Sequence, residues 1–484
     1  MQKNNKVLFF NAYKKDGFYA ERIHMGLTLL GSILTRNGIE TRVIDYSYLT
    51  GIKDKVKVPS VEDAIAEFNP SVVGVSVFTY LYDESFELIG RVARSTDAPI
   101  IVGGPHVTLF PSDFTEDKRI SYIVRGEAES VILDLVRGAK KEPSPRVINS
   151  PIPSAEDIPE INLDIALGSE FLKDYQIQLS RGCPFNCSFC SIDLIAGRRV
   201  RPRDLDACIE QIETALNKYK SIITVSITDD CPTFNRKRFK SFLQKIIDKR
   251  IEILLTVDNM RADLIDDEML DLYALAGGQN ICLGVESGNP EVFKLVHKGE
   301  SLDTIIKAAK LIKAHNLSLG LCFVIGLPED TLERHMSSIK LAKDLKPDYI
   351  YWNMCTPWPG TEIYEWFKKH GEIGDVRNFS TLINSRLEFK EPPALSIDFP
   401  KEERIKAWLM ANLETYNIPI FSLSNLKYLP STMKRLLELV IKYRLFKSFF
   451  IMLWQFVSRK LWYEVRRKIT FRKWAKKRKT SKAS

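Results

Sequence analysis

The sequence predicts an α/β protein in three parts: a doubly wound, Rossmann-like parallel sheet, a partial (β/α)6 barrel of the TIM type, and a helical C-terminal region. Short apolar runs alternate with helical segments over residues 6–135, and strands that alternate with helices form parallel sheets. The alternation resumes over residues 174–370, and strand patterns end after PPALSIDFP. We therefore expect domains at residues 1–139 and 173–385, a linker at 140–172 and the helical region at 386–484.

The elements of the first domain follow from local patterns. The run SVVGVSVF is continuous, as in a strand buried on both faces, and MGLTLLGSILTRNG has helical periodicity and ends at a glycine. The expected strands are 6–11, 41–46, 71–78, 99–104 and 121–126, and the expected helices are 25–38, 61–69, 83–96 and 129–138. Doubly wound sheets bind ligands beyond the C-terminal ends of their strands. Those ends carry Asn11, Ser76 to Thr79, Gly103 to Thr108, and Gly126-Glu127.

Residues 140–160 contain five prolines and few periodic apolar positions, which is typical of a linker. Six βα units follow. Their expected strands are 175–180, 221–228, 251–257, 280–286, 319–326 and 348–354. Active sites of such barrels lie at the C-terminal strand ends.

Composition indicates the number of domains and the cellular compartment of the protein. It has 484 residues, 45% of them apolar, and eight cysteines, so several domains can each have a core and a disulfide scaffold is excluded. The first residues lack the long apolar run of a secretory signal. We expect a reducing, cytoplasmic setting.

Three cysteines, Cys183, Cys187 and Cys190, lie in RGCPFNCSFC directly after the first barrel strand. A structural zinc site takes four protein ligands, so zinc would need a distant fourth ligand. Inert buried thiols are a second alternative. Three thiolates also suit a cubane iron–sulfur cluster with one iron left open, and this interpretation is favoured.

The same region resembles the radical SAM superfamily, in which an aromatic residue, here Phe189, precedes the last cysteine of C-x3-C-x2-C. The resemblance implies a [4Fe-4S] cluster whose open iron binds S-adenosylmethionine (SAM), and reduction that yields a 5′-deoxyadenosyl radical. Further motifs match in order: SITDDCPTFN, GVESGNPEVF, FVIGLPEDT and TPWPGTEIYE. The residues that they place near SAM are Asp229 and Asp230, Glu286 and Ser287, and Gly326.

Within that superfamily, residues 1–375 resemble proteins with an N-terminal cobalamin-binding domain. The resemblance implies that Ser76, Thr79, Gly103 and Gly104 lie along the nucleotide tail of cobalamin, the glycines because a Cβ would collide there. For His106 two interpretations stand, a structural histidine or a cobalamin contact. The D-x-H-x-x-G motif that supplies a cobalt ligand in many cobalamin enzymes does not occur, and ERIHMG at 21–26 does not fit it.

The favoured reaction is methylation of an unactivated carbon, in which cobalamin carries the methyl group and a flavodoxin or ferredoxin supplies electrons. Ring formation or rearrangement on the same scaffold is the first alternative. A methylthiotransferase is disfavoured because residues 1–150 contain no cysteine. A non-catalytic cobalamin-binding regulator would leave the cysteine motif unexplained. Among the other cysteines, Cys208, Cys282 and Cys322 are expected in the core, and Cys231 and Cys355 at strand ends.

The basic character of the chain is concentrated at its end. Residues 459–484 hold twelve Lys or Arg and one Glu, while the whole chain has a net charge of +9. Aromatic residues alternate with these cations, and Trp462, Val465 and Ile469 share a helix face. Such a helix can lie at an anionic membrane surface; the alternatives are a helix packed on the barrel and, less favoured, RNA binding. The membrane interpretation predicts a location at the inner face of the membrane and a lipid or polyprenoid substrate.

Overall fold

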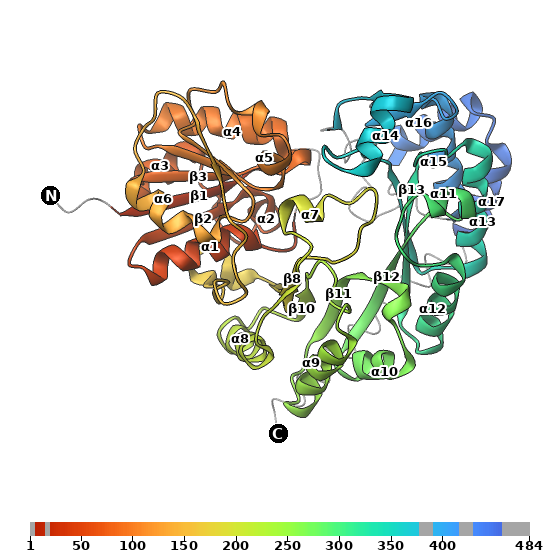
Figure 1. Cartoon of the computed structure of the whole chain (residues 1–484), viewed down its shortest axis with the longest axis horizontal. Coiled ribbons are helices and arrows are strands. Elements are labelled where there is room, and N and C mark those ends of the chain that lie inside the picture. The colour runs from red at the N-terminus through yellow and green to blue at the C-terminus, as the bar shows by residue number, and fades with distance from the viewer. Residues whose placement is uncertain (1–4, 15–19, 377–390, 416–428, 457–484) are drawn as a thin grey trace.

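A computed structural model describes residues 5–14, 20–376, 391–415 and 429–456. The predicted helix face at Trp462, Val465 and Ile469 lies outside the described residues. Two parallel sheets dominate the structure, and the C-terminal helices pack beside the second (Figure 1).

The first sheet has six parallel strands in the order β2-β1-β3-β4-β5-β6. The order reverses between β1 and β3, so the sheet is doubly wound as expected. Every residue of β3 is buried, which explains its continuous small and apolar sequence. The strands are β1 (Lys6–Asn11), β2 (Glu40–Asp45), β3 (Val72–Ser76), β4 (Ile100–Gly103), β5 (Tyr122–Arg125) and β6 (Arg146–Asn149). The helices are α1 (Met25–Arg36), α2 (Tyr46–Gly51), α3 (Val61–Phe68), α4 (Tyr82–Ser95), α5 (Pro105–Leu109) and α6 (Ile132–Gly138).

The segment expected to be a linker contributes a strand. β6 pairs in parallel with β5, and Ala166 forms an isolated bridge with Val43. β6 was missed because it is a four-residue edge strand, mostly exposed, that lies between prolines. A short edge strand needs little apolar alternation, so its sequence resembles a loop.

The second sheet also has six parallel strands, in the order β14-β13-β12-β11-β10-β7, which confirms the partial barrel. Its strands are β7 (Asp174–Ile177), β10 (Thr224–Ile227), β11 (Leu254–Met260), β12 (Gly278–Glu286), β13 (Ser318–Ile325) and β14 (Tyr349–Met354). The helices between and after them are α7 (Ile192–Ile195), α8 (Leu205–Lys218), α9 (Arg236–Asp248), α10 (Asp267–Leu275), α11 (Pro290–Lys294), α12 (Leu302–Ala314), α13 (Leu332–Leu345) and α14 (Glu362–His370). A small antiparallel pair, β8 (Ser180–Arg181) and β9 (Arg201–Pro202), flanks the cysteine loop.

Side chains of the second sheet alternate between its two faces. Val225, Leu255 and Ile350 are buried in the apolar core. Ser226 and Thr256 occupy the opposite, inner face, where their hydroxyls are 2.6 Å apart. The inner face is therefore polar at this level.

A two-stranded pair, β15 (Gly371–Ile373) and β16 (Ala394–Ser396), connects the barrel to the C-terminal helices α15 (Lys401–Thr415), α16 (Leu429–Lys442) and α17 (Phe446–Phe456). β16 thus adds a short strand to the region 386–484, which the sequence predicts to be helical. α15 packs on the outer side of β14, where the Trp408 indole donates to the Trp352 carbonyl at 3.2 Å. α17 packs on α15, and Ser448 donates to Glu414 at 3.0 Å. Within the described residues, no helix is both long and apolar enough to cross a membrane.

Candidate cofactor sites between the two sheets

The three predicted cluster cysteines lie in one loop between β8 and α7. All three are partly exposed, whereas Cys208, Cys231 and Cys355 are buried. The Ser188 amide donates to the Val296 carbonyl at 2.9 Å, and its hydroxyl donates to the Leu295 carbonyl at 2.8 Å. The loop is thus held against the segment after β12.

The cysteine loop does not resemble a site for one metal ion. Among the described residues, no three His, Cys, Asp or Glu side chains converge as the ligands of a single ion do, which disfavours zinc. In a cubane each thiolate binds a different iron, so the thiols surround a volume rather than a point. Three half-exposed thiols on one loop fit that requirement.

Two buried cations, Arg261 and Lys298, lie beside the loop. Arg261 stacks on the Phe185 ring, with its guanidinium 3.5 Å from the ring centre, and Lys298 lies 3.2 Å from Glu286. Burial raises the pKa of Cys187, and both cations oppose that effect. They are therefore placed to stabilise thiolates. No sequence pattern marks Arg261 or Lys298, because a lone Arg or Lys in a loop has no distinctive pattern.

Glu300 completes this group. Its side chain is fully buried, 3.3 Å from Arg261 and 3.8 Å from Lys298. Burial raises the pKa of Glu300 to about 7. A protonated Glu300 carries no charge and does not offset Arg261 and Lys298. The positive charge of these two side chains then acts on the nearby cysteines.

The two aspartates after β10 have different roles. Asp229 is fully buried and accepts from the Leu179 amide at 2.7 Å and the Ser180 hydroxyl at 2.6 Å. Both its oxygens accept hydrogen bonds inside the protein, so the structure does not place Asp229 as a contact of the SAM amino group. Asp230 is partly exposed and accepts from the Gly182 amide at 2.7 Å. Asp230 thus remains a candidate, beside the first cluster cysteine.

Glu286 is the last residue of β12 and Ser287 follows it, on the same side as the cysteine loop. Glu286 has a φ of 62°, a left-handed conformation that is uncommon for residues other than glycine. Its carboxylate pairs with Lys298. Ser287 is buried and accepts from the Asn289 amide at 3.2 Å. Glu286 therefore lies near the cluster loop, and Ser287 shapes the turn behind it.

Gly326 has a structural role that the sequence did not reveal. Its φ is 79°, and a Cβ there would lie 1.9 Å from the Arg404 guanidinium. Arg404, from α15, is fully buried and donates to the Gly326 carbonyl at 3.1 Å. Phe189 packs with Leu327 in a small apolar cluster. The cysteine loop, the end of β13 and the C-terminal helix therefore meet here.

At the first sheet, Ser76 belongs to a chain of hydrogen bonds along the C-terminal edge. Asn11 donates to Asp45 at 2.8 Å, the His24 amide donates to Asp45 at 2.9 Å, and the His24 ring lies 2.8 Å from the Ser76 hydroxyl. Burial lowers the pKa of His24 to about 4. His24 is thus neutral and holds Ser76 in place.

The fold itself explains one of the two glycines, Gly103 and Gly104, at the end of β4. Gly104 has a φ of 106°, and a Cβ would lie 2.9 Å from the Val77 carbonyl. Its lack of a side chain is therefore required by the protein itself, whether or not cobalamin is bound. At Gly103 a Cβ would meet nothing closer than 3.7 Å, so this position leaves space at the edge of the sheet.

Thr79 and His106 contact each other rather than open space. His106 is fully buried, with one ring nitrogen 3.2 Å from the Thr79 hydroxyl and the other 3.2 Å from Asp113. Its ring also stacks on Phe110. Of the two interpretations of His106, the structure supports the structural one, and the Thr79 hydroxyl contacts the His106 ring instead of facing a space for cobalamin.

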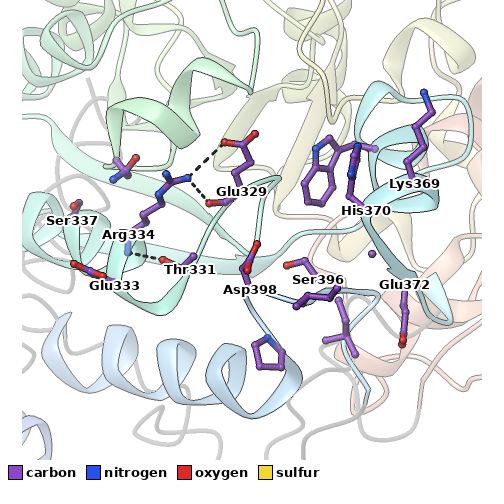
Figure 2. A pocket seen from close by; sticks show the side chains of 16 residues that line it. Glu329, Thr331, Glu333, Arg334, Ser337, Lys369, His370, Glu372, Ser396 and Asp398 are labelled. Atoms are coloured by element: carbon purple, nitrogen blue, oxygen red, sulfur yellow. Dashed lines mark hydrogen bonds and ion pairs between the residues drawn. The ribbon is translucent and has the colours of Figure 1, made fainter.

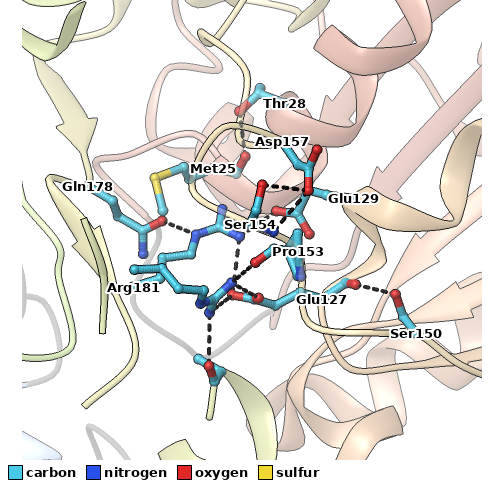
Figure 3. A network of polar contacts seen from close by, with 12 residues as sticks. Met25, Thr28, Glu127, Glu129, Ser150, Pro153, Ser154, Asp157, Gln178 and Arg181 are labelled. Atoms are coloured by element: carbon cyan, nitrogen blue, oxygen red, sulfur yellow. Dashed lines mark hydrogen bonds and ion pairs between the residues drawn. The ribbon is translucent and has the colours of Figure 1, made fainter. Parts of the chain in front are cut away.

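A buried charge network, which we call the interdomain clamp, joins the two sheets (Figure 3). Arg181, two residues before Cys183, pairs with Glu127 at 3.2 Å and Glu129 at 2.6 Å. Arg201 pairs with Glu127 at 2.6 Å. Glu127 and Glu129 follow β5, so the clamp fixes the edge of the first sheet against the cysteine loop.

A second contact, through Arg22, brings the first domain to the inner face of the barrel. Arg22 lies just before α1 and donates to Asp174 at 2.7 Å, Asp258 at 3.1 Å and Ser226 at 2.9 Å. The adjacent Ile23 carbonyl accepts from Gln176 at 2.7 Å. The C-terminal edge of the first sheet is thereby held beside the polar inner face.

The five cysteines outside the cluster motif differ in burial. Cys208 is buried in the core as predicted, and Cys355, which follows the end of β14 as predicted, is buried as well. Cys282 and Cys322 are only partly buried, with their sulfurs 3.4 Å apart, because they lie on the inner face of adjacent strands. Cys231 is buried, and its hydrogen bond with Cys183 lowers the pKa of that cluster cysteine to about 7.

A surface hollow of about 1510 Å³ lies elsewhere (Figure 2). It is lined by the first turns of α13, the end of α14 and β16, including Arg334, His370 and Asp398. As far as the described chain shows, none of the predicted site residues lines it. It is not the cofactor site.

Comparison with known proteins agrees with this arrangement. Residues 177–342 match the family model of the radical SAM superfamily, and residues 19–136 match that of the B12 binding domain. The chain is a radical SAM protein with a B12-binding domain. The cofactors of this radical SAM enzyme are a [4Fe-4S] cluster, SAM and cobalamin.

Relatives of the radical SAM enzyme include an uncharacterized methyltransferase of Pyrococcus horikoshii, 28% identical over 71% of this chain and 78% of the relative. An anaerobic magnesium-protoporphyrin IX monomethyl ester cyclase of Rubrivivax gelatinosus is 26% identical over 77% and 75%. Among solved structures, the radical SAM methyltransferase TsrM of Kitasatospora setae superposes with a TM-score of 0.64 at 18% identity, over 85% of this chain and 90% of that one. At this sequence identity, the similarity to TsrM shows that the two proteins share a fold.

Proposed function

We propose that the enzyme is a cobalamin-dependent methyltransferase that acts on an unactivated carbon. The observation that carries the proposal is the interdomain clamp, through which Arg181 joins the cysteine loop to Glu127 and Glu129 at the edge of the B12-binding sheet. A methyl donor and a radical source must reach the same substrate atom, and this clamp holds their two sites on one side of the molecule.

The protein groups have separable tasks in this proposal. The three cysteines hold the cluster, Arg261 and Lys298 stabilise its thiolates, and Asp230 holds the turn at Gly182. When bound, the cluster and SAM supply a radical that removes hydrogen from the substrate, and cobalamin supplies the methyl group. The residues proposed to contact SAM are Phe189, Asp230, Glu286 and Gly326, and those proposed along cobalamin are Ser76, Gly103 and Gly104.

Ring formation is the second candidate, because a cyclase is among the relatives. The B12-binding domain, family match and clamp are compatible with either reaction. The two reactions leave different products: methylation adds a methyl group from SAM, whereas ring closure removes hydrogen without adding carbon.

The proposal is tested by labelling cells with methionine that carries a deuterated methyl group. Extracts of cells with the intact gene are compared by mass spectrometry with extracts of cells carrying the triple Cys183→Ala, Cys187→Ala, Cys190→Ala variant. A compound with a deuterated methyl group that is lost in the variant supports methylation. A compound that differs only by lost hydrogen favours the cyclase.

We also propose a flavodoxin or ferredoxin as the electron donor, because the cluster must be reduced from outside. A location at the inner face of the membrane and a lipid or polyprenoid substrate remain proposals that rest on the basic C-terminal sequence. Lipid extracts are therefore analysed first in the labelling experiment.

A further inference from the structure

The two last described helices expose apolar side chains in pairs. On α16, Leu436, Leu439 and Val440 are buried, while Leu437 is 42% exposed and Ile441 61% exposed. The exposed pair is four residues apart, so it lies on one face of the helix. α16 is therefore apolar on two faces, and the protein covers only one of them.

α17 repeats this arrangement. Ser448 and Met452 face the protein, whereas Phe446 is 51% exposed and Phe450 66% exposed. Four of the twelve large apolar side chains that are exposed among the described residues thus fall between residues 437 and 450. Scattered exposed apolar residues need no explanation, but a concentration of them marks a contact surface.

Cations surround these apolar pairs. Five cations lie between residues 434 and 450, with one acidic residue, Glu438. All five are exposed: Lys434, Arg435, Lys442, Arg444 and Lys447. Two of them are ion-paired at the surface, Arg435 with Glu438 at 3.0 Å and Lys442 with Glu402 at 3.2 Å, so the net charge stays positive. The sequence then continues with the twelve Lys or Arg of residues 459–484. The surface is positive, and so is the chain that follows it.

One of the cations occupies a position where glycine is usual. The Leu445 amide donates to the Val440 carbonyl at 2.8 Å and the Arg444 amide to the Ile441 carbonyl at 3.1 Å, which is the Schellman pattern at the end of a helix. Arg444 has a φ of 55°, a conformation that favours glycine. Glycine would fit the turn better, but it would remove the charge.

We propose that α16 and α17 form a docking surface for an anionic membrane, with Leu437, Ile441, Phe446 and Phe450 entering the interface. Apolar side chains bordered by Lys and Arg are the features by which helices lie on membranes, and each cation near such a surface adds attraction. A second copy of the chain would bring like charges together, which disfavours self-association. This surface does not depend on the reaction that the enzyme catalyses.

The test is co-sedimentation of the full-length protein with vesicles of phosphatidylglycerol and phosphatidylcholine, or of phosphatidylcholine alone. We expect binding to the anionic vesicles, reduced about tenfold by the double substitution Phe446→Ser, Phe450→Ser because apolar insertion is lost. Arg444→Gly should reduce binding about fivefold while leaving thermal stability unchanged or higher. The matched control is Leu275→Ser, which removes a side chain that is 73% exposed on α10 and should leave binding unchanged.

Three results would overturn the proposal. The first is equal vesicle binding by the wild type, the double variant and Arg444→Gly. The second is a wild-type dimer, seen by sedimentation without vesicles, that the double substitution dissociates, since the surface would then join two copies. The third is binding of RNA in preference to anionic vesicles at equal salt, with the same sensitivity to the substitutions. Iron content and SAM cleavage of each variant show that the rest of the protein is intact.

Discussion

At the scale of single residues, burial decides which polar side chains remain available to cofactors. Asp229 and His106 both matched the pattern of a binding residue, yet both are fully buried and bonded within the protein. Asp230 and Glu286 are the neighbours that keep a position near the cysteine loop. A motif specifies which residues come together, but the sequence does not specify which of two adjacent carboxylates points inward.

The buried Asp229 predicts a specific dependence of stability on pH. Burial raises its pKa to about 7, whereas an unfolded aspartate has a pKa of about 3.9. The folded state therefore favours the protonated form, and the stability that this group contributes is present below pH about 4 and is lost as pH rises through about 7. Asp229→Asn cannot ionise, so its free energy of unfolding should rise relative to the wild type between pH 5 and 8, as denaturant unfolding can measure.

The exposed Asp54→Asn provides the baseline for removing a carboxylate. If the wild type and Asp229→Asn keep a constant difference in unfolding free energy across this pH range, Asp229 is ionised in the folded state and the prediction is wrong.

Gly326 gives a second prediction at this scale. Gly326→Ala places a Cβ against the Arg404 guanidinium and strains a left-handed backbone, a cost of about 1–3 kcal/mol. We expect a lower melting temperature and slower formation of 5′-deoxyadenosine. Gly138→Ala is the matched control, because nothing lies within 4 Å of its Cβ position. Equal rates in the two variants would show that Arg404 does not support the SAM site.

At the scale of elements, the clamp between β5 and β8 decides how the two sheets are joined. Glu127 is shared by Arg181 and Arg201, and all three side chains are at most 10% exposed. Removing one partner from a buried ion network leaves an uncompensated charge and costs about 3–5 kcal/mol. Glu127→Gln should therefore lower stability by about that amount and reduce retention of cobalamin, measured by absorbance of the purified protein.

Glu67→Gln is the control for this prediction, because it breaks an exposed pair with Arg42 in the same domain, worth about 1 kcal/mol at most. If both variants lose equal stability and retain equal cobalamin, the clamp does not couple the sheets.

The elements themselves were largely predictable, and their contacts were not. The continuous run at β3 and the strand patterns of the second sheet identified their strands because strands buried by helices are apolar over several residues. β6 escaped notice because an exposed edge strand carries no such pattern. The clamp and the Arg404–Gly326 contact join residues 54 and 78 positions apart, and no local pattern marks a partner at that distance.

At the scale of the whole molecule, both sheets turn their C-terminal strand ends toward the cysteine loop. Arg22 and the clamp hold the first sheet against the barrel at two places, and α15 supports the far side through Arg404. The proposed methyl transfer requires such an arrangement, because two cofactors would have to reach one substrate. The C-terminal helices both complete the core and carry the proposed membrane surface.

The most direct test of methyl transfer needs no substrate. Anaerobically prepared protein loaded with cobalamin and reduced is mixed with SAM that carries a deuterated methyl group, and the corrinoid is recovered for mass spectrometry. We predict that the wild type both labels the corrinoid and forms 5′-deoxyadenosine, whereas the triple Cys183→Ala, Cys187→Ala, Cys190→Ala variant forms no 5′-deoxyadenosine. A wild-type protein that forms 5′-deoxyadenosine but leaves the corrinoid unlabelled would contradict the methyltransferase proposal.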